Sequence, residues 1–174
     1  TDNTTTTTTT DTTPPTVSSS SPSDGDTSVS ITSTVSVTFS ETMDTSSVTT
    51  NTLDTSCFGT FQVSSDGFTS CVQMSSSPTS SNSDKTFTVT PKDSFSYSTI
   101  YRIRITTVTK DISGNSLGNE WTTSSRFQTG TKQWTKQLGT SSRDDGHGVT
   151  TDSSGNIYVT GETSGDLDGN TNSG

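Results

Sequence analysis

The chain has 174 residues, of which 21% are hydrophobic and 16% charged, and its net charge at pH 7 is −9. This acidic balance excludes a typical nucleic-acid binder, which neutralises phosphates with a clustered basic face. The sequence also lacks an apolar run of about 18 residues, the length that spans a membrane as a helix. Serine and threonine dominate and alanine is absent, so the composition predicts an all-β protein, because threonine suits strands and alanine is the best helix former.

Residues 1–15, TDNTTTTTTTDTTPP, contain no apolar run and end in two prolines, which is typical of a tail or linker. Asn3 begins a formal acceptor sequence for N-linked glycosylation, Asn-Thr-Thr. Threonine is also a good strand former, so the Thr run could add to the free sheet edge of a neighbouring copy and build a filament. We therefore expect either self-association through this run or a flexible glycosylated stalk.

Short runs with alternating apolar residues recur between residues 16 and 130, and they are separated by turn-forming sequences such as SPSDGD, SSDG, SSSPTSSNSD and DISGN. The runs are TVSVTF, CFGTFQVS, TFTV, IYRIRITTV and RFQT. Several short strands at this spacing predict an antiparallel β-sandwich. Alternation with a period of two places one side of each strand in the core. The residues expected to face inward are Val35, Val37, Phe39, Phe87, Val89, Tyr101, Ile103, Ile105 and Phe127.

The first alternating run continues into two acidic residues, in TVSVTFSETMD. Glu41 and Asp44 could be a carboxylate pair for acid–base chemistry or for a metal. In the structural alternative, Asp44 caps a short turn and Glu41 accepts hydrogen bonds from backbone, serine or threonine donors.

Cys57 and Cys71 are the two cysteines of the chain and lie on either side of an SSDG turn. Their spacing suits a disulfide across a short hairpin. Such a staple would stabilise a thin core by about 3 kcal/mol. A disulfide would also imply an oxidising setting outside the cytoplasm.

Two sequences of the type Asp-x-x-Gly-Asn are expected to form turns between strands. Asp111 and Asn115 belong to DISGN, and Asp152 and Asn156 belong to DSSGN. Aspartate and asparagine side chains hydrogen-bond the nearby backbone, and glycine tolerates a positive φ.

Residues 131–174 are rich in glycine and contain a strand HGVTT, the turn DSSGN and a strand IYVTG. This is about the content of one propeller blade, which cannot bury both of its faces alone. The following DLDGNTN places oxygen atoms at every second position, so Asp166, Asp168 and Asn170 are a candidate calcium loop; the alternative is a polar propeller loop.

The sequences SPSDGDTSVSITSTVSVTFSETMD, TFTVTPKDSFSYSTIYRIRITTVTKDISGNSL and RFQTG resemble the bacterial Ig-like domains first described in S-layer proteins. In that family a strand ends in Phe-Ser-Glu-x-Met-Asp, and a later Asp-x-x-Gly-Asn turn precedes the last strand. The resemblance covers residues 16–130 and implies an Ig-like sandwich in which Glu41 and Asp44 have no catalytic role. The insertion that holds the two cysteines departs from the family pattern, as does Ser98-Thr99 in place of Gly-Thr.

The tail WTKQLGTSSRDDGHGVTTDSSGNIYVTGETSGDLDGNT resembles a bacterial β-propeller repeat, abbreviated SBBP. The match implies a partial propeller in residues 131–174, and we expect the parent protein to continue. His147, the one histidine, is expected to be half-buried in this repeat, and it excludes zinc clusters of several histidines. Trp121 and Trp134 could stack on sugars, but packing at the junction of the two modules is the favoured role.

These features favour a non-catalytic structural module of a bacterial cell-surface protein, acting as a spacer, an adhesive or a fibre-forming subunit. No nucleophile, base and orienting group converge in the sequence, so we do not expect an enzyme. The alternative is a carbohydrate- or calcium-binding accessory module of a larger secreted enzyme. No cofactor other than calcium is expected, and surface glycans are candidate partners.

Overall fold

The computed structural model describes residues 10–133, 139–153 and 156–166. The chain divides into two compact units, residues 1–132 and 133–174. The described residues form ten β-strands and no helix, which confirms the all-β prediction. Accordingly, they include no helix that could cross a membrane.

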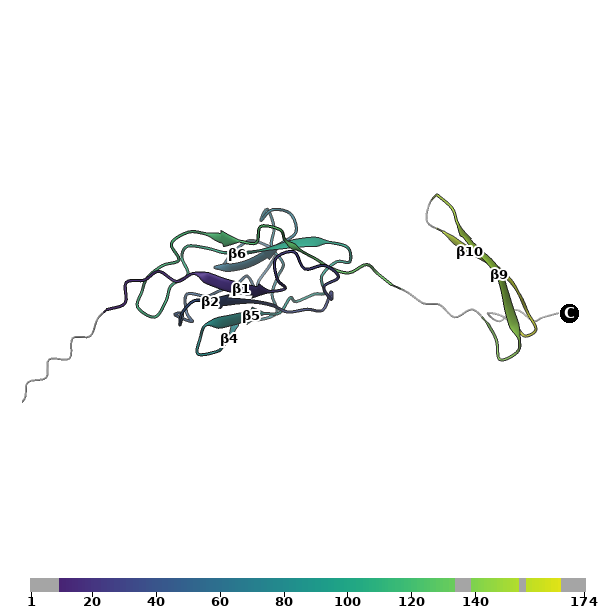
Figure 1. Cartoon of the computed structure of the whole chain (residues 1–174), viewed down its shortest axis with the longest axis horizontal. Coiled ribbons are helices and arrows are strands. Elements are labelled where there is room, and N and C mark those ends of the chain that lie inside the picture. The colour runs from purple at the N-terminus through teal and green to yellow at the C-terminus, as the bar shows by residue number, and fades with distance from the viewer. Residues whose placement is uncertain (1–9, 134–138, 154–155, 167–174) are drawn as a thin grey trace, which may run out of the picture. The chain divides into compact units, whose positions relative to one another are not determined.

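The first unit consists of two antiparallel sheets that face each other across one core (Figure 1). The strands of the first sheet are, in spatial order, β1 (Val17–Ser21), β2 (Val35–Phe39), β5 (Thr86–Val89) and β4 (Thr79–Ser81). The second sheet contains β3 (Phe61–Ser64), β6 (Ile100–Ile105) and β7 (Trp121–Thr122), and β8 (Phe127–Gln128) pairs with the start of β6. This is the predicted β-sandwich.

The core follows the alternation of the strands. On β2, every second side chain is buried, and Val37 pairs with Phe87 of β5. Phe39 and Phe87 meet edge to face with ring centroids 5.9 Å apart. All nine residues predicted to face inward are buried, and Phe61, Val63, Met43, Val48, Met74, Phe95 and Leu117 complete the core. Each fully buried apolar side chain of this size contributes roughly 1.5–3 kcal/mol.

Some strands differ from the sequence prediction. Residues 79–81, expected to be loop, form β4, whose three side chains are all exposed and which is held by backbone pairing to β5. Conversely, only the second half of CFGTFQVS is a strand, because β3 begins at Phe61.

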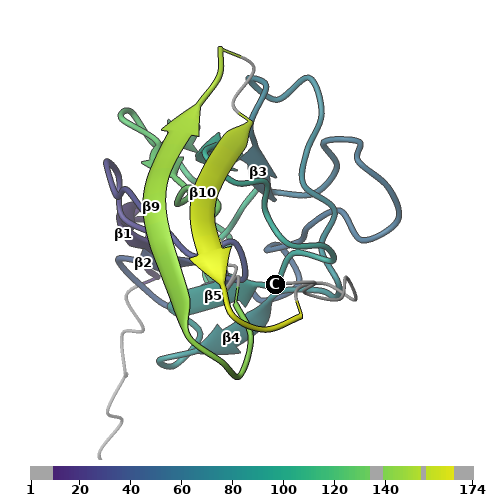
Figure 2. The ribbon, with the colours of Figure 1, turned by 90° about the vertical axis from the view of Figure 1, so that its right-hand side faces the viewer.

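The second unit contains an antiparallel hairpin of β9 (Asp144–Thr151) and β10 (Ile157–Thr163), seen as a twisted ribbon in Figure 2. The large apolar side chains of this hairpin are exposed: Val149 is 72% exposed and Val159 is 55% exposed. His147 is also exposed, so the expectation of a half-buried histidine is wrong. A two-stranded hairpin has no second layer to bury these side chains.

Candidate functional site

The DISGN turn is built around Asp111, whose side chain is buried. The Asp111 carboxylate accepts the backbone N–H groups of Ser113 and Asn115, each at 2.8 Å, and the side-chain amide of Asn115, also at 2.8 Å. Gly114 has a φ of +89°, which the turn requires. Asp111 also forms a β-bridge with Met43, so the turn lies beside the end of the sequence that contains Glu41.

Three carboxylates gather at this point, from Asp11, Glu41 and Asp111. One oxygen atom of each lies within 4.8 Å of the other two. The side-chain amide of Asn115 also donates to the backbone oxygen of Asp11 at 3.1 Å, which ties the end of the tail to the turn. Glu41 was expected to accept bonds from backbone, serine or threonine donors, and the structure instead places it against two other carboxylates.

The close approach of the acids changes their proton affinities. Burial raises the pKa of Glu41 above its ordinary value, and hydrogen bonding to Asp11 and the charges of Asp11 and Asp111 raise it further. The pKa of Asp11 is lowered, chiefly by the backbone N–H of Thr13. The arrangement can therefore share a proton between Glu41 and Asp11. Carboxylate oxygens are also the ligands that hard cations prefer.

Asp44 does not take part in this cluster. Its carboxylate accepts the backbone N–H of Ser46 at 2.9 Å and the Ser46 hydroxyl at 2.7 Å, and these bonds lower the pKa of Asp44. The backbone N–H of Ser47 donates to the Asp44 carbonyl. Asp44 therefore shapes the turn that follows β2, as the structural alternative predicts.

Cys57 and Cys71 are joined by a disulfide, with their Cα atoms 5.0 Å apart. The surrounding loop is not the regular hairpin expected from the sequence, because β3 ends at Ser64 and no strand follows directly. The returning chain is held by backbone bonds from the N–H groups of Cys71, Val72 and Met74 to the carbonyl oxygens of Thr55, Val63 and Asn51. At the tip of the loop, Asp66 accepts bonds from Ser70 and Ser64, which lower its pKa to about 2.

The turn of the second unit repeats the chemistry of the DISGN turn. The Asp152 carboxylate accepts the backbone N–H of Asn156 at 2.9 Å, its side-chain amide at 2.7 Å and the Tyr158 hydroxyl at 3.0 Å. Of the candidate calcium loop, Asp166 is described, whereas Asp168 and Asn170 lie outside the described residues. Asn3, the Thr run up to residue 9 and Trp134 lie outside them as well. Trp121 packs against the sandwich core, in line with a packing role.

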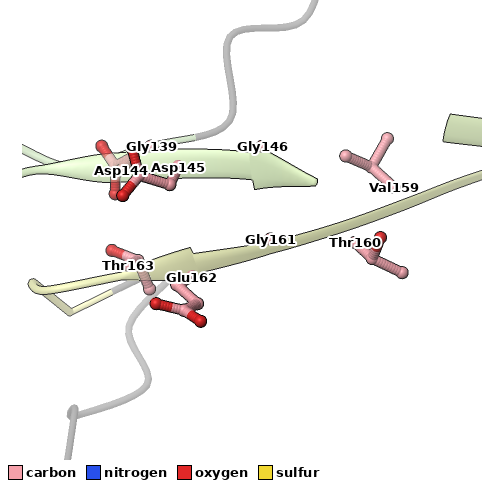
Figure 3. A pocket seen from close by; sticks show the side chains of 9 residues that line it. All are labelled: Gly139, Asp144, Asp145, Gly146, Val159, Thr160, Gly161, Glu162 and Thr163. Carbon is pink, nitrogen blue, oxygen red and sulfur yellow. The ribbon is translucent and has the colours of Figure 1, made fainter. Parts of the chain in front are cut away.

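A hollow of about 200 Å³ lies between the two strands of the hairpin, and Figure 3 shows the side chains that line it. Three of these are acidic, from Asp144, Asp145 and Glu162. Asp144 accepts the backbone N–H of Thr140 at 2.8 Å, and Asp145 forms an ion pair with Arg143 at 2.9 Å. The lone histidine, His147, is not among the residues that line this hollow.

Comparison with known proteins identifies both parts of the chain. Residues 11–129 match the family model of the bacterial Ig-like domain, and residues 133–168 match that of the beta-propeller repeat. Similar solved structures include surface layer protein SbsC, domains 1–6, with 18% identity, a TM-score of 0.48 and coverage of 84% of this chain and 19% of that chain. Another is the crystal structure of the S-layer protein rSbsC, with 18% identity, a TM-score of 0.47 and coverage of 91% of this chain and 21% of that chain.

A third similar structure is the N-terminal part of the S-layer protein SbsC, with 17% identity and a TM-score of 0.48. It is matched over 91% of this chain and 37% of that chain. This chain thus spans well under half the length of the solved structures it resembles. No curated protein matches it significantly.

Proposed function

Because the chain belongs to the bacterial Ig-like domain family, we propose that it is a non-catalytic structural module of an extracellular or cell-surface protein. In this role the sandwich is a spacer that holds neighbouring parts of the protein at a distance. The observation that carries the proposal is that acidic side chains in the turns of the sandwich form hydrogen bonds within those same turns. Asp44 and Asp111 each bond to their own turn, so these groups serve the fold.

The disulfide supports a location outside the cytoplasm. Cys57 and Cys71 are the two cysteines of the chain and are bonded to each other, and no free cysteine is present. Disulfides persist in oxidising compartments and are rare in the cytosol, where thiols are kept reduced. A thin core made largely of short strands is the kind of domain that benefits from such a bond.

The location can be tested on intact cells that express the parent protein. An antibody against residues 10–132 should label unpermeabilised cells or appear in the secreted fraction. Labelling only after permeabilisation would contradict the proposal. A catalytic domain elsewhere in the parent gene would instead indicate an accessory module of a secreted enzyme.

We further propose self-association by strand addition. The outer strand β4 is exposed at all three residues and pairs with β5 on one side, so its other edge offers free backbone groups. The Thr run of a second copy has the β-propensity to add there. Removing residues 1–13 should abolish assembly in light scattering and electron microscopy while the sandwich stays folded. Unchanged oligomers of the truncated chain would exclude the proposal.

Glycosylation of the many serine and threonine side chains is a separate proposal. The composition supports it, because exposed hydroxyl groups are abundant on β1 and β4. Intact mass measurement of the native protein tests it directly. A mass equal to that of the bare chain would exclude any modification.

A further inference from the structure

The outward side of the second sheet carries arginines in an otherwise acidic protein. On β6, Tyr101 and Ile103 are buried, so the alternating residues Ile100, Arg102 and Arg104 face away from the core. On β8, Phe127 is buried, which turns the neighbouring Arg126 outward as well. The whole chain has only nine lysines and arginines against 18 acidic residues, so three arginines on one sheet face are a local concentration of positive charge.

Two of these arginines lie on the same part of the surface, because both line one hollow. Arg102 belongs to β6, and Arg126 directly precedes β8, whose pairing with β6 ends at Tyr101 and Phe127. No carboxylate of residues 10–133, 139–153 or 156–166 forms an ion pair with either guanidinium group. The described side chains thus leave both positive charges of this hollow without an ion-pair partner.

Arg104, by contrast, is fully engaged in the fold. Its Nε donates to Gln62 Oε1 at 2.8 Å, its guanidinium carbon lies 4.0 Å above the Phe68 ring, and Glu120 is 3.9 Å away. Arg104 therefore holds the loop tip of the disulfide region against the sheet. This difference leaves Arg102 and Arg126 as the two arginines available to a ligand.

The backbone at Arg126 is held in an unfavourable conformation. Its φ is +71°, in the left-handed region that residues other than glycine rarely adopt. The Asp24 carboxylate enforces this geometry by accepting the backbone N–H groups of Ser124 at 3.1 Å, Ser125 at 2.7 Å and Arg126 at 2.7 Å. The Asp24 carboxylate therefore fixes the backbone from which the Arg126 side chain extends.

Both arginines line one hollow of about 190 Å³, which is closed on the other side by Ser64, Ser65 and Gly67 of the disulfide loop. A second hollow of about 100 Å³ shares Ile100 and Arg126 with the first. Its other walls are mainly polar and include Asp26, Thr27, Ser125 and Gln128. We call the two hollows, which meet at Ile100 and Arg126, the groove; both arginines line its first hollow.

We propose that this groove binds an acidic polysaccharide, with a sugar carboxylate between Arg102 and Arg126. Guanidinium groups bind carboxylates through paired hydrogen bonds, and a carboxylate in the first hollow could accept such bonds from the two arginines that line it. The polar walls of the second hollow suit sugar hydroxyl groups, and exposed Ile100 offers an apolar surface to a sugar ring.

The surrounding acids narrow the choice of ligand. Asp26 lines the second hollow, and Asp24 and Asp66 are next to residues that line the two hollows. Together with the net charge of −9, they repel a dense polyanion such as a nucleic acid. A chain with one carboxylate in every second sugar places a single negative charge between the arginines and neutral sugars beside the acids.

The test is calorimetric titration of the full chain with a hyaluronan octasaccharide, which alternates carboxylated and neutral sugars, and with its carboxyl-reduced counterpart. The native chain should bind only the carboxylated sugar. Arg102→Gln and Arg126→Gln should each weaken binding about tenfold or more. Lys92→Gln removes one positive charge from an exposed position outside the groove and should leave the affinity unchanged.

Folding and binding effects can be separated in the same variants. Arg102 forms no ion pair with the described residues, so Arg102→Gln should leave the melting temperature without sugar unchanged. Equal binding by the native chain and both arginine variants would overturn the proposal, as would equal binding of the carboxyl-reduced sugar. Tighter binding of a single-stranded oligonucleotide or of an acidic peptide would also overturn it. None of these results bears on the spacer role, which cell labelling tests independently.

Discussion

Gly59 precedes β3 by two residues and has a φ of +81°. A Cβ atom at this position would lie 2.7 Å from the Thr50 Cα and 2.8 Å from the Thr49 carbonyl oxygen. We predict that Gly59→Ala lowers the free energy of unfolding by about 2 kcal/mol or more, because both the φ and the backbone contact oppose a side chain. Denaturant titration measures the change.

Gly118→Ala is the matched control for this prediction. A Cβ atom at Gly118 meets nothing within 4 Å, and its φ is not in the left-handed region. The variant should therefore be as stable as the native chain or slightly more stable, since alanine restricts the unfolded chain. If both variants change the free energy of unfolding by the same amount, the backbone near Gly59 can relax to accept a side chain.

At Glu41, the folded chain raises the pKa of the carboxyl above its ordinary value, first through burial and then through Asp11 and Asp111. The folded state therefore binds the Glu41 proton more tightly than the unfolded state, and Glu41 costs stability once pH rises above its raised pKa. We predict that Glu41→Gln stabilises the protein at pH 7 by roughly 0.5 kcal/mol, the scale of exposed charge interactions.

The stabilisation by Glu41→Gln should disappear below pH 4, where Glu41 is protonated in both states. Melting temperatures of the two proteins across this pH range provide the measurement. If the difference in melting temperature between the two proteins is the same at pH 3 and pH 7, the substitution acts through packing and the three carboxylates do not interact.

The turn residues could be predicted from the sequence because their bonds are local. Asp111 contacts Asn115 and Asp152 contacts Asn156, four positions along the chain in each case. The meeting of Asp11 with Asp111 joins residues that are a hundred positions apart, and no local pattern in the tail indicates it. For the same reason, the hollow shared by Arg102 and Arg126 becomes visible only once the pairing of β6 with β8 is known.

At the scale of elements, alternation identified the strands that bury side chains. β2, β5 and β6 each place alternate side chains in the core, and all three were expected. β4 was missed because Thr79, Ser80 and Ser81 are all exposed and polar, so the strand exists through backbone pairing alone. A hydrophobic pattern carries no information about such an edge strand.

The disulfide loop is the element whose stability depends most on a covalent bond. Its return segment is not a regular strand, and its backbone bonds go to several separate segments, among them Thr55, Val63 and Asn51. We predict that replacing Cys57 and Cys71 together with alanine lowers the free energy of unfolding by about 3 kcal/mol, from the entropy that the unfolded chain regains. Thermal and denaturant unfolding measure the loss.

The matched control for the cysteine replacement is the native chain treated with reductant. The reduced native chain and the double alanine variant should unfold at similar denaturant concentrations. If the reduced chain keeps the full stability of the oxidised one, the disulfide does not contribute as proposed. If only the alanine variant is destabilised, the loss comes from the packing of buried Cys71.

At the scale of the whole molecule, the two units differ in what they bury. The first unit closes a core between two sheets, whereas the hairpin of the second leaves Val149, Tyr158 and Val159 more than half exposed. We predict that residues 10–132 alone unfold in one cooperative transition, while residues 133–174 alone lack stable structure, because an isolated two-stranded hairpin is marginal in water.

Circular dichroism and the NMR chemical-shift dispersion of the amide protons, measured on each fragment, check this expectation. The larger fragment should keep the native melting temperature. A folded small fragment would mean that residues outside the described part of the hairpin complete its packing. A larger fragment that fails to fold would mean that the sandwich needs the rest of the chain.

The segment that follows β1 runs parallel to the last segment of the sandwich where the two meet. Val29 forms a parallel bridge with Thr129, and backbone bonds join Val29 to Gln128 and Gly130 to Val29. If tension is applied to the two ends of the sandwich and β1 is pulled from β2, these parallel segments are drawn in opposite directions along their length, so their bonds are loaded together in shear. An antiparallel arrangement would open one bond at a time, like a zipper. The sandwich should therefore resist extension between its termini strongly, a property that suits a domain placed in series within a chain under load.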